Sequence, residues 1–206
     1  VLKAEVAAAG GEMSQAVWLI EKAGQLAPQD LPTQLARVRM LLAVGDRLRV
    51  QQELTQLARF AADDPEVLAL QAEAALRTDN EAAATRAIDR LAEVDGDHDR
   101  GRVARLRGEV HARHARDADA IAAFATAVEL DPTDVAAVIA LASLRLRAEP
   151  RSAALAPLDA TRQRLQSDPR AAVRPKLRAL ALAHANLLAE TGRKDQAIGV
   201  LDAALA

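Results

Sequence analysis

Three aspartates stand at alternate positions in the run VDGDHDRGR, as the first ligands of a calcium loop do. They are Asp95, Asp97 and Asp99. A calcium loop of the EF-hand type also needs glycine at its sixth position and a bidentate glutamate at its twelfth. Arg100 and Leu106 stand at those two positions instead. The run therefore predicts a turn between two helices, in which the aspartates cap the following helix, with a weak metal site as the alternative.

Two histidines are also spaced for metal binding. His111 and His114 are three residues apart, and on one helix a metal ion could bridge them. A zinc site needs at least a third protein ligand, and the chain has no cysteine and no HExxH pattern. The other histidines, His98 and His184, are isolated. We therefore expect paired surface histidines and no metal site.

Nucleophilic and phosphate chemistry have no better support. The serines stand in no GxSxG-like setting, and the AGG at 9–11 lacks the lysine and the hydroxyl residue of a phosphate loop. The serines in question are Ser14, Ser143, Ser152 and Ser167. We expect no catalytic residue and no cofactor, and hence a protein that is not an enzyme.

The composition favours an all-α fold. Half of the 206 residues are hydrophobic, but only two Phe, one Trp and no Tyr are present, so Ala, Leu and Val must fill the interior. Such residues suit close helix packing, whereas sheets favour aromatic and β-branched residues. Because 27 Lys and Arg nearly balance 29 Asp and Glu, no nucleic-acid partner is expected. No apolar run approaches the roughly 18 residues of a membrane span, so we expect no membrane insertion.

A turn recurs along the chain and defines a repeat of about 34 residues. Successive turns are separated by 34, 34, 36, 34 and 43 residues. Small and apolar residues at fixed offsets after each turn share one face of a helix, and another column belongs to the helix before the turn. The turn position is held by Gly11, Gly45, Asp79, Ala115, Glu149 and Gly192.

Four apolar columns accompany these turns and form the predicted core. Small residues that face each other across a helix pair let the two helices approach closely. The columns after the turn are Ala16, Val50, Ala84, Ala120, Ala154 and Ala197, then Ile20, Leu54, Ile88, Phe124, Leu158 and Leu201, then Ala23, Leu57, Leu91, Ala127, Thr161 and Ala204. The column before the turn is Ala4, Val38, Ala72, Gly108, Ala142 and Ala185.

Each repeat is thus two helices joined by a short turn, which resembles the tetratricopeptide repeat family. The fourth repeat, RLRGEVHARHARDADAIAAFATAVELDP, has Gly108, Ala120, Phe124, Ala127 and Pro132 at the signature positions of that family. The resemblance implies an α-α superhelix, a right-handed solenoid of about twelve antiparallel helices in six pairs. We expect one repeat domain over 1–206, with repeats at about 1–30, 31–64, 65–98, 99–134, 135–168 and 169–206.

The longest spacing lies between the fifth and sixth turns, where nine extra residues accompany QSDPRAAVRPKL. Pro169 and Pro175 can each begin a helix but fit poorly inside one. We expect a longer linker or an extended, kinked helix over 165–177, as a tolerated insertion, with altered superhelix curvature or a partner contact as the alternative. Because neither end has a polar capping helix, we also expect a piece of a longer protein, or self-association through the uncapped ends.

The resemblance implies that the first helix of each pair lines a concave groove, which this family commonly uses to hold peptides. By register, one groove-facing column runs Glu5, Arg39, Glu73, Glu109, Ser143 and Asn186, and the next runs Ala9, Ala43, Arg77, Arg113, Arg147 and Glu190. An arginine ladder in the groove could hold acidic side chains or a C-terminal carboxylate. The alternative is that the arginines pair with Glu73, Glu109 and Glu149 in a solvated face. The candidate binding residues are Arg39, Glu73, Arg77, Arg102, Arg105, Glu109, Arg113, Arg147 and Asn186.

These features favour a non-enzymatic scaffold that binds a protein or peptide partner. The Ala- and Arg-rich repeats resemble bacterial arrays of secretion and exopolysaccharide-export systems, in the cytoplasm or at the periplasm and cell envelope. A helical accessory or regulatory domain of a larger enzyme or regulator, and a groove that binds an anionic polymer, are the alternatives. Trp18 is expected to pack between repeats, with an exposed anchor at the end of the array as the alternative.

Overall fold

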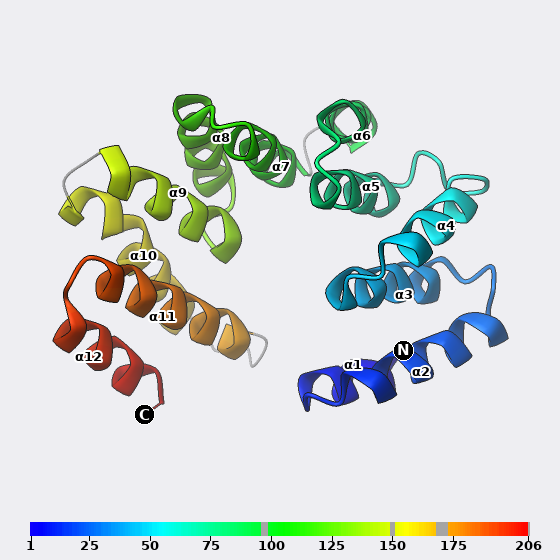
Figure 1. Cartoon of the computed structure of the whole chain (residues 1–206), viewed down its shortest axis with the longest axis horizontal. Helices are drawn as coiled ribbons and strands as arrows, with labels where there is room; N and C mark the ends of the chain where they lie inside the picture. Colours follow the sequence, from blue (N-terminus) through cyan, green and yellow to red (C-terminus); the bar gives the residue numbers. More distant parts are fainter. Residues whose placement is uncertain (96–98, 149–150, 168–172, 206) are drawn as a thin grey trace. The chain divides into compact units, whose positions relative to one another are not determined.

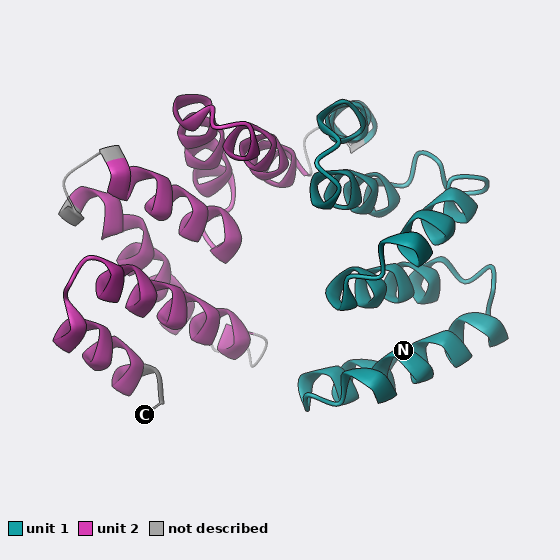
Figure 2. Ribbon diagram, in the orientation of Figure 1, with its two compact units in different colours: residues 1–98 teal, residues 99–206 magenta. Residues whose placement is uncertain are grey.

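A computed structural model describes residues 1–95, 99–148, 151–167 and 173–205. Over these ranges the chain forms twelve α-helices and no strand (Figure 1), which confirms the all-α prediction. The chain divides into two compact units, Val1–His98 and Asp99–Ala206 (Figure 2). The division coincides with the boundary predicted between the third and fourth repeats.

In unit 1, aspartates begin three of the helices. Asp30, Asp46 and Asp64 occupy N-cap positions, and each carboxylate accepts a hydrogen bond from a backbone amide of the first turn. Such caps satisfy amides that have no partner within the helix. The helices of unit 1 are α1 (Leu2–Ala9), α2 (Met13–Leu26), α3 (Leu31–Val44), α4 (Arg47–Leu57), α5 (Pro65–Arg77) and α6 (Glu81–Asp95).

Unit 2 contains the two longest of the described helices, which cover 165–166 and 173–177 of the predicted linker or kinked helix over 165–177; residues 168–172 lie outside the described residues. These two helices are α10 with 16 residues and α11 with 18 residues. Pro175 lies in the first turn of α11, as expected for a proline that begins a helix, whereas Pro157 inside α10 was not anticipated. Pro169 lies outside the described residues. The helices of unit 2 are α7 (Arg100–Arg113), α8 (Asp117–Leu130), α9 (Val135–Ala148), α10 (Arg151–Gln166), α11 (Val173–Glu190) and α12 (Lys194–Leu205).

The predicted turn column has one backbone conformation. Gly11, Gly45 and Gly192 have φ angles of 83°, 83° and 81°, in the left-handed region that glycine enters at little cost. Asp79 and Ala115 occupy the same region with φ angles of 57° and 53°. The sixth member, at position 149, lies outside the described residues. A left-handed residue after the first helix lets the chain reverse into the second helix of each pair.

The predicted core columns are buried, with few exceptions. The column on the first helices, from Ala4 to Ala185, is buried throughout, and so is the column from Ala16 to Ala197. Of the remaining columns, Ala23 is half-buried and Leu201 is 36% exposed. The side chain of Ala204 is not among those that the structure describes. The period of 34 residues therefore identifies the core face of nearly every helix.

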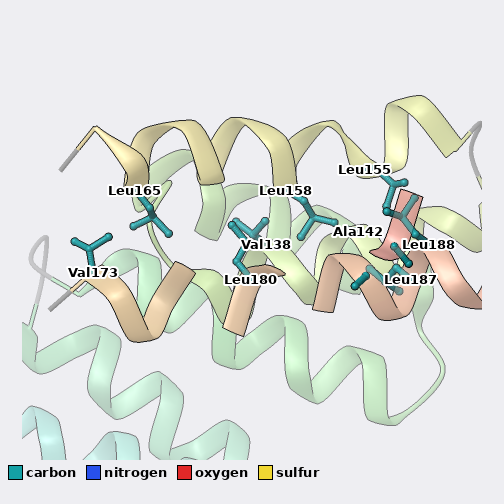
Figure 3. Packing of buried hydrophobic residues seen from close by; sticks show 11 residues of the cluster. Val138, Ala142, Leu155, Leu158, Leu165, Val173, Leu180, Leu187 and Leu188 are labelled. Carbon is teal, nitrogen blue, oxygen red and sulfur yellow. The ribbon is translucent and has the colours of Figure 1, made fainter. Parts of the chain in front are cut away.

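Close approach of helices occurs where the column has its smallest residue. A Cβ atom added to Gly108 on α7 would lie 2.8 Å from the ring of Phe124 on α8. Elsewhere in unit 2, four helices contribute buried residues to one cluster: Val138 from α9, Leu158 from α10 and Leu180 from α11 lie close together in Figure 3, and α12 adds Ala197. Burial of such apolar side chains is the main stabilising contribution in a helical repeat.

The predictions for Asp99 and Trp18 need correction. Asp99 occupies the N-cap position of α7 but makes no capping hydrogen bond with its side chain; its Oδ2 accepts instead from Arg102 Nη1 at 3.1 Å. Trp18 is 57% exposed, so the prediction that it packs between repeats is wrong. It lies midway between Ala16 and Ile20, which point into the core, and so faces away from it. Asp97 and His98 lie outside the described residues.

Candidate functional site

The predicted groove-facing columns lie on the first helices of the pairs, which are α1, α3, α5, α7, α9 and α11. Every member of the second column is exposed: Ala9, Ala43, Arg77, Arg113, Arg147 and Glu190. In the first column, Glu5, Arg39 and Asn186 are exposed, and Glu73, Glu109 and Ser143 are half-buried. The two columns therefore mark a face of the first helices that the core does not use.

In unit 1 the arginines of this face are tied to neighbouring helices. Arg39 on α3 forms an ion pair with Glu66 on α5. Arg77, at the end of α5, donates from Nη1 to the carbonyl oxygen of Leu42 at 3.2 Å, near the end of α3. A cation near these carbonyls also interacts favourably with the negative end of the α3 dipole. These side chains link adjacent repeats within unit 1.

In unit 2 the arginines differ in how firmly they are held. Arg105 on α7 pairs with Glu109 one turn away and, through Nε, with Asp134 at 3.2 Å, just before α9 begins. Arg147 on α9 is 73% exposed and lies 3.7 Å from Asp117, at the start of α8. The side chain of Arg113 makes no hydrogen bond or ion pair with any described residue. Of these three arginines, Arg113 at the end of α7 is thus the most available for a partner.

The arginine ladder remains a prediction. Arg77 belongs to unit 1, whereas Arg113 and Arg147 belong to unit 2. The alternative of pairing within a solvated face applies in part, because Glu109 pairs with Arg105 and Arg147 with Asp117. The third proposed acidic partner, at position 149, lies outside the described residues.

The histidines do not assemble into a ligand set. His111 and His114 are both half-buried rather than on the open surface, and Nδ1 of His111 is buried without a hydrogen-bond partner. Among the described residues, no three His, Cys, Asp or Glu side chains gather where they could hold a metal ion.

A buried histidine on α11 has an acidic neighbour that sequence reasoning missed. His184 is buried, and its Nδ1 lies 3.9 Å from Oδ1 of Asp159 on α10. Burial lowers the pKa of His184 below its ordinary value of 6.5, and the charge of Asp159 opposes part of that shift. His184 stands one position before Ala185 of the core column, which was a signal for burial.

Polar side chains between α2, α3 and α4 were also missed. Gln34 on α3 donates from Nε2 to the carbonyl oxygens of Gly24 and Ala27, at 3.2 and 2.9 Å, and so caps the end of α2. Arg37 and Glu53 form an ion pair of 2.7 Å between α3 and α4, with little exposure of either side chain. The contacts of Gln34 link adjacent repeats, and the Arg37–Glu53 pair links the two helices of one repeat, so we assign both a structural role.

On α11, a row of exposed side chains extends the predicted columns. At four-residue spacing it consists of Arg174, Arg178, Leu182, Asn186 and Glu190, all exposed. Only Asn186 and Glu190 of this row were predicted from the repeat register. The same four-residue step, continued towards the start of the helix, would have reached Leu182 and Arg178.

No protein-family model and no curated protein matches this sequence. Solved structures do match. A tetratricopeptide repeat protein from Parabacteroides merdae is 13% identical with a TM-score of 0.71, covering 98% of this chain and 74% of that one. TTC0263, a thermophilic protein of the same repeat class from Thermus thermophilus, is 20% identical with a TM-score of 0.69, covering 88% and 97%. PilW, a type IV pilus biogenesis factor, is 16% identical with a TM-score of 0.66, covering 100% and 96%.

The described helices include none that is both long and apolar enough to cross a bilayer. The all-helical, paired architecture of the chain agrees with the fold of these solved structures. The chain therefore has the fold of the tetratricopeptide repeat proteins.

Proposed function

We propose that the chain is a non-enzymatic scaffold that binds a protein partner through the exposed face of its first helices. The observation that carries the proposal is the second groove-facing column, because it is exposed in all six repeats while the core columns beside it are buried. Repeats of this kind stack to present extended binding surfaces.

The likeness to tetratricopeptide repeat structures supports the same role, since such solenoids present one helix of each pair to a ligand. A more specific role in bacterial secretion or exopolysaccharide export is not part of the proposal, because no residue of this chain supports it.

Site-specific photocrosslinking tests the proposal. A photoreactive amino acid is placed in the full chain at Arg113 or at Asn186, both exposed on first helices, and irradiated in a lysate of the source organism. The matched control positions are Arg86 on α6 and Arg164 on α10, which are exposed arginines on second helices. Mass spectrometry then identifies the adducts.

The proposal predicts one recurrent protein adduct at the first-helix positions and its absence at the control positions. Equal yields of the same adducts at all four positions, or adducts confined to the second helices, would contradict it.

A further inference from the structure

Cations concentrate on the first helices of unit 2. Helices α7, α9 and α11 carry ten Arg and Lys against two Glu, whereas α1, α3 and α5 of unit 1 carry four against three. The ten are Arg100, Arg102, Arg105, Arg107, Arg113, Arg145, Arg147, Arg174, Lys176 and Arg178. The whole chain has a net charge of −2, so this surface is basic against the general composition.

Internal contacts leave part of this charge uncompensated. Arg102 and Arg105 are held by carboxylates, and Lys176 Nζ donates to the carbonyl oxygen of Thr133 at 3.4 Å. Arg113 and Arg178 are exposed, and their side chains make no hydrogen bond or ion pair with described residues. An approaching carboxylate therefore need not displace an internal partner to pair with them.

Apolar side chains lie among these cations. Leu182 is 56% exposed on α11, four residues after Arg178 and four before Asn186. Helix α9 contacts α11. Its equivalent row contains the half-buried Ile139 and the exposed Arg147. On α9 and α11, exposed cations and apolar side chains thus lie in rows with a spacing of four residues.

We propose that this surface, defined by Arg113, Ile139, Arg147, Arg178 and Leu182, binds an extended protein segment that presents acidic and apolar residues on the same side. The inference rests on the proposed function and specifies the chemistry of its partner. Carboxylates of the segment pair with the guanidinium groups, which match them in planar, bidentate geometry. Apolar side chains of the segment cover Leu182 and Ile139 and remove them from water.

The surface suits a protein segment better than a nucleic acid. Proteins that bind single-stranded nucleic acid stack the bases on exposed aromatic side chains. Unit 2 offers none in its described residues, because its one aromatic side chain, that of Phe124, is buried.

Fluorescence anisotropy of the full chain provides the test. The probe is a short labelled peptide of Glu-Glu-Leu-Leu repeats, which presents both residue types on each side of an extended chain, compared with the same peptide carrying Gln for Glu. The variants are Arg113→Glu and Arg178→Glu, with Arg164→Glu on α10 as the control of equal charge change. We expect the acidic peptide to bind about tenfold more tightly than the neutral one, with a further loss of about tenfold in each first-helix variant. The control changes affinity by less than about twofold, and added salt weakens binding.

Two results would overturn the proposal: equal affinity for the acidic and the neutral peptide, or an equal loss in the Arg164→Glu control. Tighter binding of a single-stranded DNA oligonucleotide than of the acidic peptide, lost in Arg113→Glu, would also overturn it in favour of an anionic polymer. Circular dichroism checks that each variant is folded, and Leu182→Ser tests the apolar contact without a charge change. Failure here, with first-helix crosslinks still observed, leaves the scaffold function in place and rejects only the acidic partner.

Discussion

At the scale of single residues, the turn after α7 holds an alanine where three equivalent turns hold glycine. Ala115 has a φ of 53°, and the amide of Arg116 donates to the carbonyl oxygen of His111 at 2.9 Å, which closes the end of the helix. A left-handed conformation costs a residue with a Cβ atom roughly 1–2 kcal/mol. The turn keeps this conformation because the helices on both sides of it are packed.

Ala115→Gly is therefore expected to stabilise the protein. Relief of the left-handed conformation exceeds the extra entropy of glycine in the unfolded chain, for a net gain of about 0.5–1 kcal/mol. Chemical denaturation followed by circular dichroism measures it. The matched control is Ala118→Gly, at an exposed site inside α8, which should destabilise by up to about 1 kcal/mol. A loss of stability in Ala115→Gly would contradict the account.

The buried His184 predicts a loss of stability in mild acid. Because burial lowers the pKa of His184 in the folded chain, the unfolded chain takes up a proton that the folded chain resists. The stabilising contribution is complete above pH 6.5 and falls as the pH drops below that value towards the lowered pKa. Asp159 and Arg162 are the charged groups that act on this histidine: the first opposes the lowering of its pKa and the second adds to it.

Urea denaturation at a series of pH values from 7 to about 5 tests this effect. In the native sequence the unfolding midpoint should fall with pH, and in His184→Gln the slope should be smaller. Identical slopes in the two proteins would show that His184 does not carry the dependence. Carboxylates such as Asp63, whose pKa is lowered by its hydrogen bond with Arg90, act in a separate window below pH 3.8.

At the scale of elements, the close approach of α7 and α8 depends on a missing side chain. Gly108→Ala would place a Cβ atom against the ring of Phe124, so α7 and α8 must move apart. Overpacking of this kind costs about 1–3 kcal/mol, offset by up to about 1 kcal/mol of helix propensity. We expect a net loss in the free energy of unfolding.

The same substitution at Gly101, also on α7, separates packing from propensity. An added Cβ there would make only ordinary contacts, the nearest at 3.6 Å, so Gly101→Ala should be neutral or stabilising. In a Phe124→Leu background, Gly108→Ala should cost less than in the native sequence. If both glycine substitutions had the same effect, the close approach of the helices would not be the cause.

How well sequence reasoning predicted each element depends on whether its signal was periodic. The period of 34 residues predicted the helix pairs, the turn positions and the buried face, because the same packing problem recurs in every repeat. Pro157 was not expected inside α10, since a single proline gives no periodic signal and tertiary packing tolerates it there. The lengths of α10 and α11 likewise depend on packing that has no counterpart in the other repeats.

At the scale of the whole molecule, the repeat register predicted which arginines are exposed better than it predicted their partners. The register placed Arg77, Arg113 and Arg147 at exposed positions, but the partners of Arg77 and Arg147 come from neighbouring repeats and could not be read from one helix. Arg77 bonds a backbone carbonyl, which no charge pattern indicates. Trp18 was expected to pack between repeats, although its spacing from the buried Ala16 and Ile20 indicated an exposed position.

Each compact unit has its own hydrophobic clusters, so each is expected to fold alone. Expressed separately, segments 1–98 and 99–206 should both show helical circular dichroism and cooperative thermal unfolding. Retention of helix by only one of them would mean that the other depends on its neighbour for stability. Trp18 reports on the first segment alone, since it is the only tryptophan in the chain.

The central claim is that the first helices of the repeats form the interaction surface. Hydrogen exchange of the full chain, measured by mass spectrometry with and without the crosslinked partner, tests it most directly. The account predicts slower exchange in the first helices, above all α7, α9 and α11, while α8, α10 and α12 change little. Protection concentrated in the second helices, with the first helices unchanged, would contradict it.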